Sequence, residues 1–325
     1  MSQPSAPSGP RVGLVLGGGA NAGIAHHIGA LLALHTDLGW DPRQAEVIVG
    51  TSAGSIVATL LRAGCSPEDL AAWCAEVDPS EEGVEARPAL DLVRAARPKA
   101  SLPAMEPLNL MLMMRLAAAH HRRDRIQACL APRGFLRVQD AMGPLGAVMP
   151  DGWPKRPLWI TAVRRHDARF VVLGRDRQDV PVPRAVAASC AVPGLFAPVR
   201  FHRSEYVDGG VRSPTSADVL AGLGLDLVIV SSPMSGPWQC ARGSSNRRMR
   251  RHARASLRWE VAKVEASGTP VHVIEPSEAE LAVIGRNPFD TGRMLPVARE
   301  AFFSAGAAHR SWPEHHPLER LAESA

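Results

Sequence analysis

Ser52 lies in the segment Gly50-Thr51-Ser52-Ala53-Gly54, which has the GxSxG spacing of a nucleophilic serine. The β-branched run Val47-Ile48-Val49 precedes this segment, and a helical stretch at residues 55–63 follows it. The glycines permit a tight turn that lifts the serine hydroxyl clear of the backbone, and the amino end of the next helix favours developing negative charge. The pattern therefore indicates covalent catalysis by a serine.

A serine nucleophile needs a base that takes its proton. Asp208 lies just beyond an expected strand in the segment Tyr206-Val207-Asp208-Gly209-Gly210, where the paired glycines let the backbone turn tightly, although DGG alone also fits a plain hairpin turn. The more common base is a histidine that is oriented by an acid. The later histidines are His166, His202, His252, His272, His309, His315 and His316. None of them lies in a recognisable loop after a strand with an acid partner. A Ser-His-Asp esterase remains an alternative.

A run of three glycines, Gly17, Gly18 and Gly19, follows the apolar run at residues 12–16. Backbone amides in such a loop can hold an oxyanion or a phosphate. The competing interpretation is a dinucleotide-binding loop, which needs a glycine where this chain has Ala22 and an acid after the second strand. The chain has Gly50 and Thr51 at that second place, so an oxyanion loop is favoured.

The elements that must position these residues alternate between strand and helix. Helical periodicity in Ile24, Ile28, Leu31 and Leu32 predicts a helix that ends near Gly39. A second helix should end at Gly64, a third should begin at Ser66 and Pro67, and a late helix should cover residues 288–306. Strands are expected at residues 12–16, 46–49, 158–163, 170–173, 227–230 and 271–274, with a hairpin at 201–211. This order predicts a mostly parallel sheet between helices, with irregular helices from residues 78–157 over one side.

The composition sets outer limits on the class of protein. The chain has 325 residues, 46% of them hydrophobic and 21% charged, as in an ordinary globular protein. Its net charge of +5 suits an acidic partner such as phospholipid head groups or nucleic acid. The five cysteines are scattered without a CxxC motif, which predicts no zinc site and a reducing, cytoplasmic setting. The paired histidines (His26 and His27, His120 and His121, His315 and His316) are interpreted as packed or surface residues rather than metal ligands.

Residues 1–10 are rich in Pro, Ser and Gly and are expected to form a disordered lead, with no signal peptide after them. The sequence contains no window of about 18 uncharged apolar residues, which is the length needed to span a membrane. One segment is densely basic, because residues 242–258 carry seven arginines and no acid. It is expected to be either a solvated surface or a peripheral contact with anionic head groups, and its arginines are Arg242, Arg247, Arg248, Arg250, Arg251, Arg254 and Arg258.

Taken together, the glycine loop, the GTSAG segment and the DGG segment about 150 residues later resemble, in order, the motifs of the patatin-like phospholipases. The blocks HIGALLAL, VIVGTSAGSIVATLLRAG, AVAASCAVPGLFAPV and EYVDGGV also resemble family blocks. The resemblance covers residues 11–306, which we expect to form one domain before a tail at 307–325. It implies a three-layer α/β/α fold with a mostly parallel central sheet, and a carboxylic ester hydrolase that cleaves fatty acyl esters of lipids through a Ser–Asp dyad and an acyl-enzyme. It implies no cofactor, no metal and no nucleic acid partner.

Carried over by position, the resemblance makes Ser52 the nucleophile and Asp208 its base. It assigns Gly17, Gly18 and Gly19 to the oxyanion loop. Gly50 and Gly54 shape the turn at the serine, and Gly209 and Gly210 shape the turn at the aspartate. Ser189 and Pro193 match a family block interpreted as structural support.

The chain departs from the family pattern in the glycine loop. The family usually has an arginine or lysine near the loop's end, where this chain has Asn21 or Ala22. A lipid-binding relative with weak or no catalysis is therefore a second hypothesis.

Overall fold

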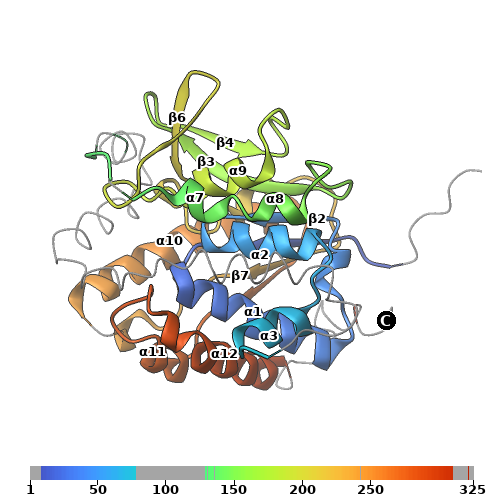
Figure 1. Ribbon diagram of the computed structural model, residues 1–325. Helices are drawn as coiled ribbons and strands as arrows, with labels where there is room; N and C mark the ends of the chain where they lie inside the picture. Colours follow the sequence, from blue (N-terminus) through green and yellow to red (C-terminus); the bar gives the residue numbers. More distant parts are fainter. Residues whose placement is uncertain are drawn as a thin grey trace, which may run out of the picture.

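The structure is a computed structural model that describes residues 9–77, 129, 131–134, 136–241, 243–309 and 321. Its centre is one sheet with the strand order β5-β6-β3-β2-β1-β7-β8, and β4 pairs with β3. In Figure 1 the strands β3, β4 and β6 lie at the top of the molecule, above α2. The strands are β1 Val12–Leu16, β2 Val47–Gly50, β3 Leu158–Arg164, β4 Arg169–Leu173, β5 Val199–Phe201, β6 Ser204–Asp208, β7 Leu227–Ser231 and β8 Val271–Ile274.

Five strands, β3, β2, β1, β7 and β8, run parallel to their neighbours in that order. Every residue of β1, β2 and β7 is buried, as expected of near-continuous apolar runs in a sheet covered on both faces. The remaining pairs, of β3 with β4, β3 with β6 and β5 with β6, are antiparallel. The sheet is therefore mostly parallel, as the sequence predicts.

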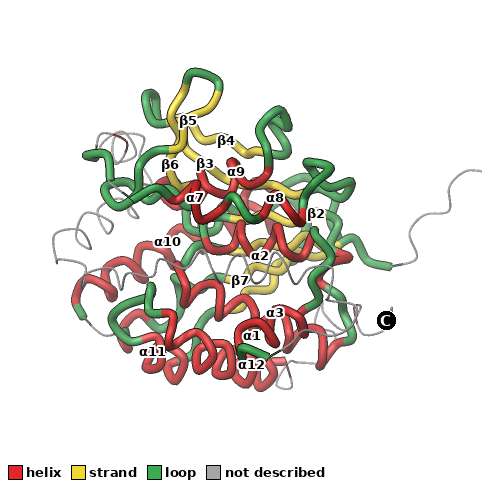
Figure 2. Tube along the Cα trace, in the orientation of Figure 1, coloured by secondary structure: helices red, strands yellow, loops and turns green. Residues whose placement is uncertain are grey.

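Helices cover both faces of the sheet. Leu14 and Ile48 lie in a core shared with α1 Ala20–Leu38, α2 Ala53–Arg62 and α9 Val182–Ser189. Val15 and Val49 point the other way, into a core shared with α10 Ser244–Glu265 and the short helix η4 Ala217–Leu220. Figure 2 shows α7 Val138–Met142 and α8 Leu145–Val148 near α9 in the upper part of the molecule. The predicted three-layer α/β/α architecture is confirmed.

Two helices near the C-terminal end of the described chain lie outside the first helical layer. Figure 1 shows α11 Glu278–Ile284 and α12 Met294–His309 along the bottom, beneath α1. Because α12 also packs on α1, the α1 helix is buried on nearly all sides, beyond the single apolar face that the sequence indicates. The late helix begins at Met294 rather than at residue 288, since Asp290 first caps the short helix η6 Thr291–Arg293 through the Gly292 amide at 3.0 Å.

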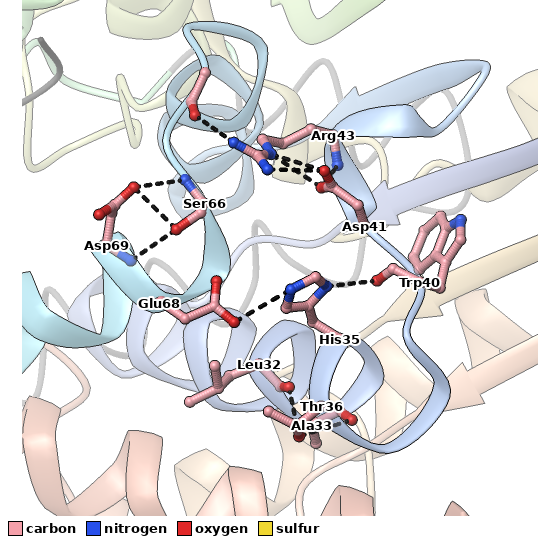
Figure 3. A network of polar contacts seen from close by, with 11 residues as sticks. Leu32, Ala33, His35, Thr36, Trp40, Asp41, Arg43, Ser66, Glu68 and Asp69 are labelled. Atoms are coloured by element: carbon pink, nitrogen blue, oxygen red, sulfur yellow. Dashed lines mark hydrogen bonds and ion pairs between the residues drawn. The ribbon is translucent and has the colours of Figure 1, made fainter. Parts of the chain in front are cut away.

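The helix α3 Pro67–Cys74 begins as predicted. The Ser66 hydroxyl accepts the Asp69 amide at 3.0 Å, and the Asp69 carboxylate accepts the Ser66 amide at 3.0 Å, which makes a capping box (Figure 3). Nearby, Asp41 caps η1 Pro42–Gln44 and binds the Arg43 guanidinium, which also donates to the Gly64 carbonyl at 2.9 Å. These contacts join the segment before β2 to the end of α2. Of the segment 78–157 expected to cover the sheet, residues 78–128 lie outside the described residues.

Candidate active site

Ser52 occupies a strained turn between β2 and α2. Its backbone has φ 51° and ψ −121°, in the region that favours glycine, and it is half-buried. A side chain at Gly50 would place a Cβ 2.5 Å from Ser55 Cα, and one at Gly54 would overlap the Leu16 carbonyl. Strain of this kind costs about 1–3 kcal/mol and accumulates at functional sites. The geometry is that of a nucleophile elbow, in which the serine side chain is exposed at the end of the sheet.

The strands β2 and β6 bring Ser52 and Asp208 together along one edge of β3. Since β4 pairs with residues 160–164 of β3, both β2 and β6 must lie along the opposite edge, β2 beside 158–160 and β6 beside 162–164. They run in opposite directions and end beside Thr161. There the Thr51 and Thr161 hydroxyls are 2.7 Å apart, and a side chain at Gly209 would overlap the Thr161 hydroxyl.

Asp208 is 5% exposed. The Gly210 amide donates to its Oδ1 at 2.7 Å, and the Ser52 side chain interacts with the carboxylate. Burial raises the pKa of Asp208 to about 7, although the Gly210 hydrogen bond and the Ser52 side chain act in the opposite direction. A carboxylate with a pKa near neutral pH, in contact with a serine hydroxyl, can serve as a general base.

The segment after α9 connects the two residues from the other side. The Ser189 hydroxyl accepts the Ser52 amide at 2.8 Å, and the Ala191 carbonyl accepts the Asp208 amide at 3.0 Å. Cys190 lies between Ser189 and Ala191, and burial and the nearby Asp208 carboxylate raise the pKa of its thiol. Cys190 is therefore a neutral thiol beside Ser52 and Asp208 and does not supply a reactive thiolate.

The glycine loop lies beside the elbow, and two of its three amides donate within the protein. Gly17 donates to the Ser231 carbonyl at 3.0 Å, and Gly18 donates to the Pro214 carbonyl at 2.8 Å. A Cβ at Gly18 would lie 3.4 Å from Ser52 Cβ, so the loop faces the serine. In the described part of the chain, the Gly19 amide has no acceptor.

Where the family pattern has a cation, this loop is held by other groups. The Asn21 side chain donates to the Phe289 carbonyl at 2.8 Å, and the Ala22 amide donates to the Pro288 carbonyl at 2.9 Å. The segment before α12 therefore anchors the end of the glycine loop through neutral hydrogen bonds.

Glu260 of α10 supports the segment that accepts the Gly18 amide. It is 1% exposed, and its Oε2 accepts the Thr215 hydroxyl at 2.6 Å and the Ala217 amide at 2.8 Å. Burial raises the pKa of Glu260. This carboxyl fixes Thr215 and Ala217, the residues on both sides of Ser216, next to the Pro214 carbonyl that accepts the Gly18 amide. It therefore connects α10 to the glycine loop.

Several supporting residues are missed by motif reasoning, which names Ser52, Asp208 and the glycines. Two of them carry a signal in helical spacing. His27 lies three residues after Ile24 and four before Leu31, and Glu260 lies three residues after Leu257 and four before Val264, so both occupy apolar faces. Thr161 and Ser231 carry no such signal, because only the sheet register places them at the site.

The arginine-rich segment forms the first part of α10, and Arg242 lies outside the described residues. Arg250 is 7% exposed, with its guanidinium donating to the Pro233 carbonyl at 2.8 Å and the Ser235 carbonyl at 2.9 Å. Burial lowers the pKa of Arg250 to about 10. The expectation that this segment is either a solvated surface or a head-group contact is therefore wrong for Arg250, which supports the protein interior. The arginines of the segment with exposed side chains are Arg247, Arg248, Arg251 and Arg258.

Among the described residues, no three His, Cys, Asp or Glu side chains group closely enough to hold a metal ion. None of the described helices combines the length and apolar character that crossing a bilayer requires.

Comparison with known proteins identifies relatives of this chain. A model of the family "Patatin-like phospholipase" matches residues 14–221, which include the glycine loop, Ser52 and Asp208. Uncharacterized NTE family proteins of Mycobacterium tuberculosis and Mycobacterium bovis are 28% identical over 227 residues, which cover 69% of this chain and 49% of the relative. The chain thus spans about half the length of these curated relatives.

Among solved structures, VipD from Legionella pneumophila is similar with a TM-score of 0.41 and 15% identity, covering 94% of this chain and 68% of that one. Human GIVD cytosolic phospholipase A2 is similar with a TM-score of 0.42 and 12% identity, covering 98% of this chain and 63% of that one. The family match extends over more than half of the chain and spans each of the three motifs. The protein therefore belongs to the patatin-like phospholipase family.

Proposed function

We propose that the protein is a serine lipid acyl hydrolase that cleaves fatty acyl esters through a dyad of Ser52 and Asp208. The observation that carries the proposal is the contact between the Ser52 side chain and a buried carboxylate whose pKa lies at about 7. Membership of a family of phospholipases supports a lipid ester as the substrate. The Asp208 carboxylate accepts the Gly210 amide and interacts with the Ser52 side chain, which favours a dyad over a histidine triad.

In the first step, the Asp208 carboxylate takes the proton of Ser52 Oγ as that oxygen attacks the ester carbonyl carbon. The tetrahedral intermediate collapses when the bond between this carbon and the alcohol oxygen breaks. Asp208 returns its proton to the leaving alcohol, and the acyl group stays on Ser52. In the second step, water attacks the acyl-serine while Asp208 takes a proton from the water. The free fatty acid leaves, and Ser52 regains its proton.

We place the oxyanion of both intermediates at the glycine loop and the start of α2. Since Gly17 and Gly18 donate to protein carbonyls, we propose that they shape the loop and that the Gly19 amide faces the oxyanion. Ala53, at the first position of α2, has an amide with no acceptor in the described part of the chain and is the second donor. Donors of this kind stabilise charge as it develops.

We further propose that the exposed arginines at the start of α10 bring this site to an anionic lipid surface. The β7, α10 and β8 elements form a crossover between parallel strands, so α10 begins at the edge where the strands end. The glycine loop and Ser52 follow β1 and β2 at that same edge. The exposed side chains of Arg247, Arg248 and Arg251 therefore lie toward the side of the molecule that holds the active site.

The apolar side chains within this helix take different places. Met249 and Leu257 are buried in the protein core, so neither side chain can enter a head-group layer. Trp259 is 57% exposed, and Lys263 lies 5.2 Å from the centre of its ring. The membrane contact is therefore proposed to rest on charge, with Trp259 as the large apolar side chain on the outer face of α10.

A long-chain fluorophosphonate probe tests the hydrolase, because its phosphorus is attacked by an activated serine and the adduct can be mapped by mass spectrometry. We expect an adduct at Ser52 and strongly slowed labelling in Asp208→Asn. An adduct at Ser55 or Ser189, with Ser52 unmodified, would exclude the assignment. Absence of labelling in folded protein that still binds lipid would instead support a lipid-binding protein without catalysis.

A further inference from the structure

His27 of α1 is buried beneath the glycine loop and has no exposed surface. Its Nε2 lies 2.7 Å from the Gly17 carbonyl oxygen, and its Nδ1 lies 2.7 Å from the Ser231 hydroxyl oxygen. These two hydrogen bonds of His27 involve neither Ser52 nor Asp208. Its place at the glycine loop nevertheless ties it to the site.

The two contacts define which ring nitrogen carries the proton. A carbonyl oxygen can only accept, so Nε2 must donate to Gly17. Burial and the neighbouring His26 lower the pKa of His27 to about 3, although the Gly17 hydrogen bond acts in the opposite direction, so the ring is neutral at working pH. Its Nδ1 therefore accepts from the Ser231 hydroxyl. The chain of hydrogen bonds runs in one direction, from Ser231 through His27 to Gly17.

These bonds fix one peptide plane from both ends. The peptide between Gly17 and Gly18 has its carbonyl held by His27 and its amide held by the Pro214 carbonyl at 2.8 Å. A glycine run has little intrinsic preference for one orientation of such a plane. The next peptide carries the Gly19 amide and is joined to this plane at the Gly18 Cα, so a fixed first plane restricts the directions open to that amide.

We propose that His27 is a positioning residue, which holds the peptide between Gly17 and Gly18 in place and thereby aims the Gly19 amide at the site of the Ser52 reaction. The inference rests on the proposed hydrolase function for its kinetic consequence. Its structural part, the fixing of the loop, is independent of turnover. His27 acts through the loop and contacts no reacting atom.

Three variants separate positioning from general loss of stability. His27→Leu removes the donor to Gly17, whereas His27→Gln keeps an N–H at a similar reach from the backbone. Thr269→Val is the matched control, because it removes a buried hydroxyl that donates to the Leu225 carbonyl at 3.1 Å, at the opposite edge of the sheet. All three are compared with the wild type by thermal unfolding, by kcat and KM on a soluble ester, and by hydrogen exchange of the Gly18 amide.

We expect His27→Leu to lower kcat by roughly 10- to 100-fold with little change in KM, since small misplacements of catalytic groups cost rates of this size. The Gly18 amide should lose protection in that variant. His27→Gln should keep kcat within about threefold of the wild type with Gly18 protected, because it restores the donor. Thr269→Val should lower the unfolding temperature without changing kcat or Gly18 protection.

The inference is overturned if His27→Leu keeps Gly18 protected, or if His27→Gln is as impaired as His27→Leu. A wild type that shows no labelling at Ser52 would overturn the hydrolase instead. In that case the exchange of the Gly18 amide still decides whether His27 fixes the loop.

Discussion

The backbone amide of Ser52 donates a 2.8 Å hydrogen bond to the side-chain oxygen of Ser189, a residue 137 positions later in the chain. Ser189 is the last residue of α9 and is completely buried. The strained backbone of Ser52 is therefore held by a side chain from another element, as strain in a folded protein requires.

Ser189→Ala should leave that amide without an acceptor in a buried place, which destabilises the protein by about 1–3 kcal/mol. Because the elbow is then less well fixed, kcat on a soluble ester should fall while KM changes little. Thermal unfolding and steady-state kinetics measure the two effects. Ser304→Ala on α12, which removes a hydroxyl that donates to the Ala301 carbonyl at 3.2 Å, is the control that should leave kcat unchanged. An unaltered kcat in Ser189→Ala would show that the turn at Ser52 keeps its conformation without the Ser189 hydrogen bond.

The pH dependence of kcat/KM should report the ionisation of Asp208 in the free enzyme. Only the carboxylate can accept the Ser52 proton, and its pKa lies at about 7. Activity should therefore rise about tenfold per pH unit below 7 and level off above it. Hydrolysis of a soluble ester from pH 5 to 9 gives the profile. A midpoint near pH 4 would mean that the base is an ordinary, solvated carboxylate.

Asp208→Asn should reduce turnover by a factor on the order of 10³, since an amide cannot accept the serine proton. Substitution of any single histidine should cost less, and a histidine as critical as Asp208 would favour a triad.

The same substitution should change how stability depends on pH. The pKa of Asp208 is raised from 3.8 to about 7 in the folded chain, so the folded state holds a proton between these values that the unfolded state has released. The wild type therefore loses stability as the pH rises from about 4 to 7, and Asp208→Asn lacks this loss. Chemical unfolding at pH 4, 6 and 8 should show that the free energy of unfolding of the variant rises relative to that of the wild type as the pH rises. A difference in this free energy that is the same at all three pH values would mean that Asp208 does not have the raised pKa.

Replacement of Arg247, Arg248 and Arg251 by serine should remove most binding to anionic vesicles. Each arginine near such a surface contributes on the order of 1 kcal/mol, and the contribution falls off within a Debye length. Arg250 is kept, because it supports the backbone at Pro233. Co-sedimentation with anionic and neutral vesicles, at low and high salt, measures the effect.

The matched control for this triple variant replaces three other exposed arginines, Arg175, Arg200 and Arg203. It changes the net charge by the same amount and should keep vesicle binding. Hydrolysis of a soluble ester should be unchanged in both triple variants. Equal binding by the wild type and the Arg247, Arg248 and Arg251 variant would mean that this face of α10 is only solvated surface.

The sequence predicts the parts of the fold that depend on neighbouring residues. The strand, turn and helix around Ser52 follow from a local run of residue types, as does the start of α3 at Ser66. The meeting of β2 and β6 at Thr161 could not be predicted in this way, because it depends on the register of strands far apart in the chain. The position of Asp208 beside Ser52 follows from that register.

The arginine-rich segment shows a different limit. Counting its charges treats all of its arginines alike, whereas a helix of 3.6 residues per turn separates them into faces. Arg250 lies with Met249 and Ala253 on the buried face, and Arg251 lies outside. The helical period could have made this distinction, but only once the segment was known to be a helix rather than a loop.

The glycine loop of this chain is anchored by an amide side chain, a neutral imidazole and carbonyl groups, with no exposed ion pair among them. Dissolved ions screen the attraction between charges and act little on buried neutral hydrogen bonds. Raising the ionic strength should therefore release the proposed membrane contact of α10 while the geometry of the glycine loop persists. The proposed attachment to a lipid surface and the order of the glycine loop are thus expected to respond differently to simple salt.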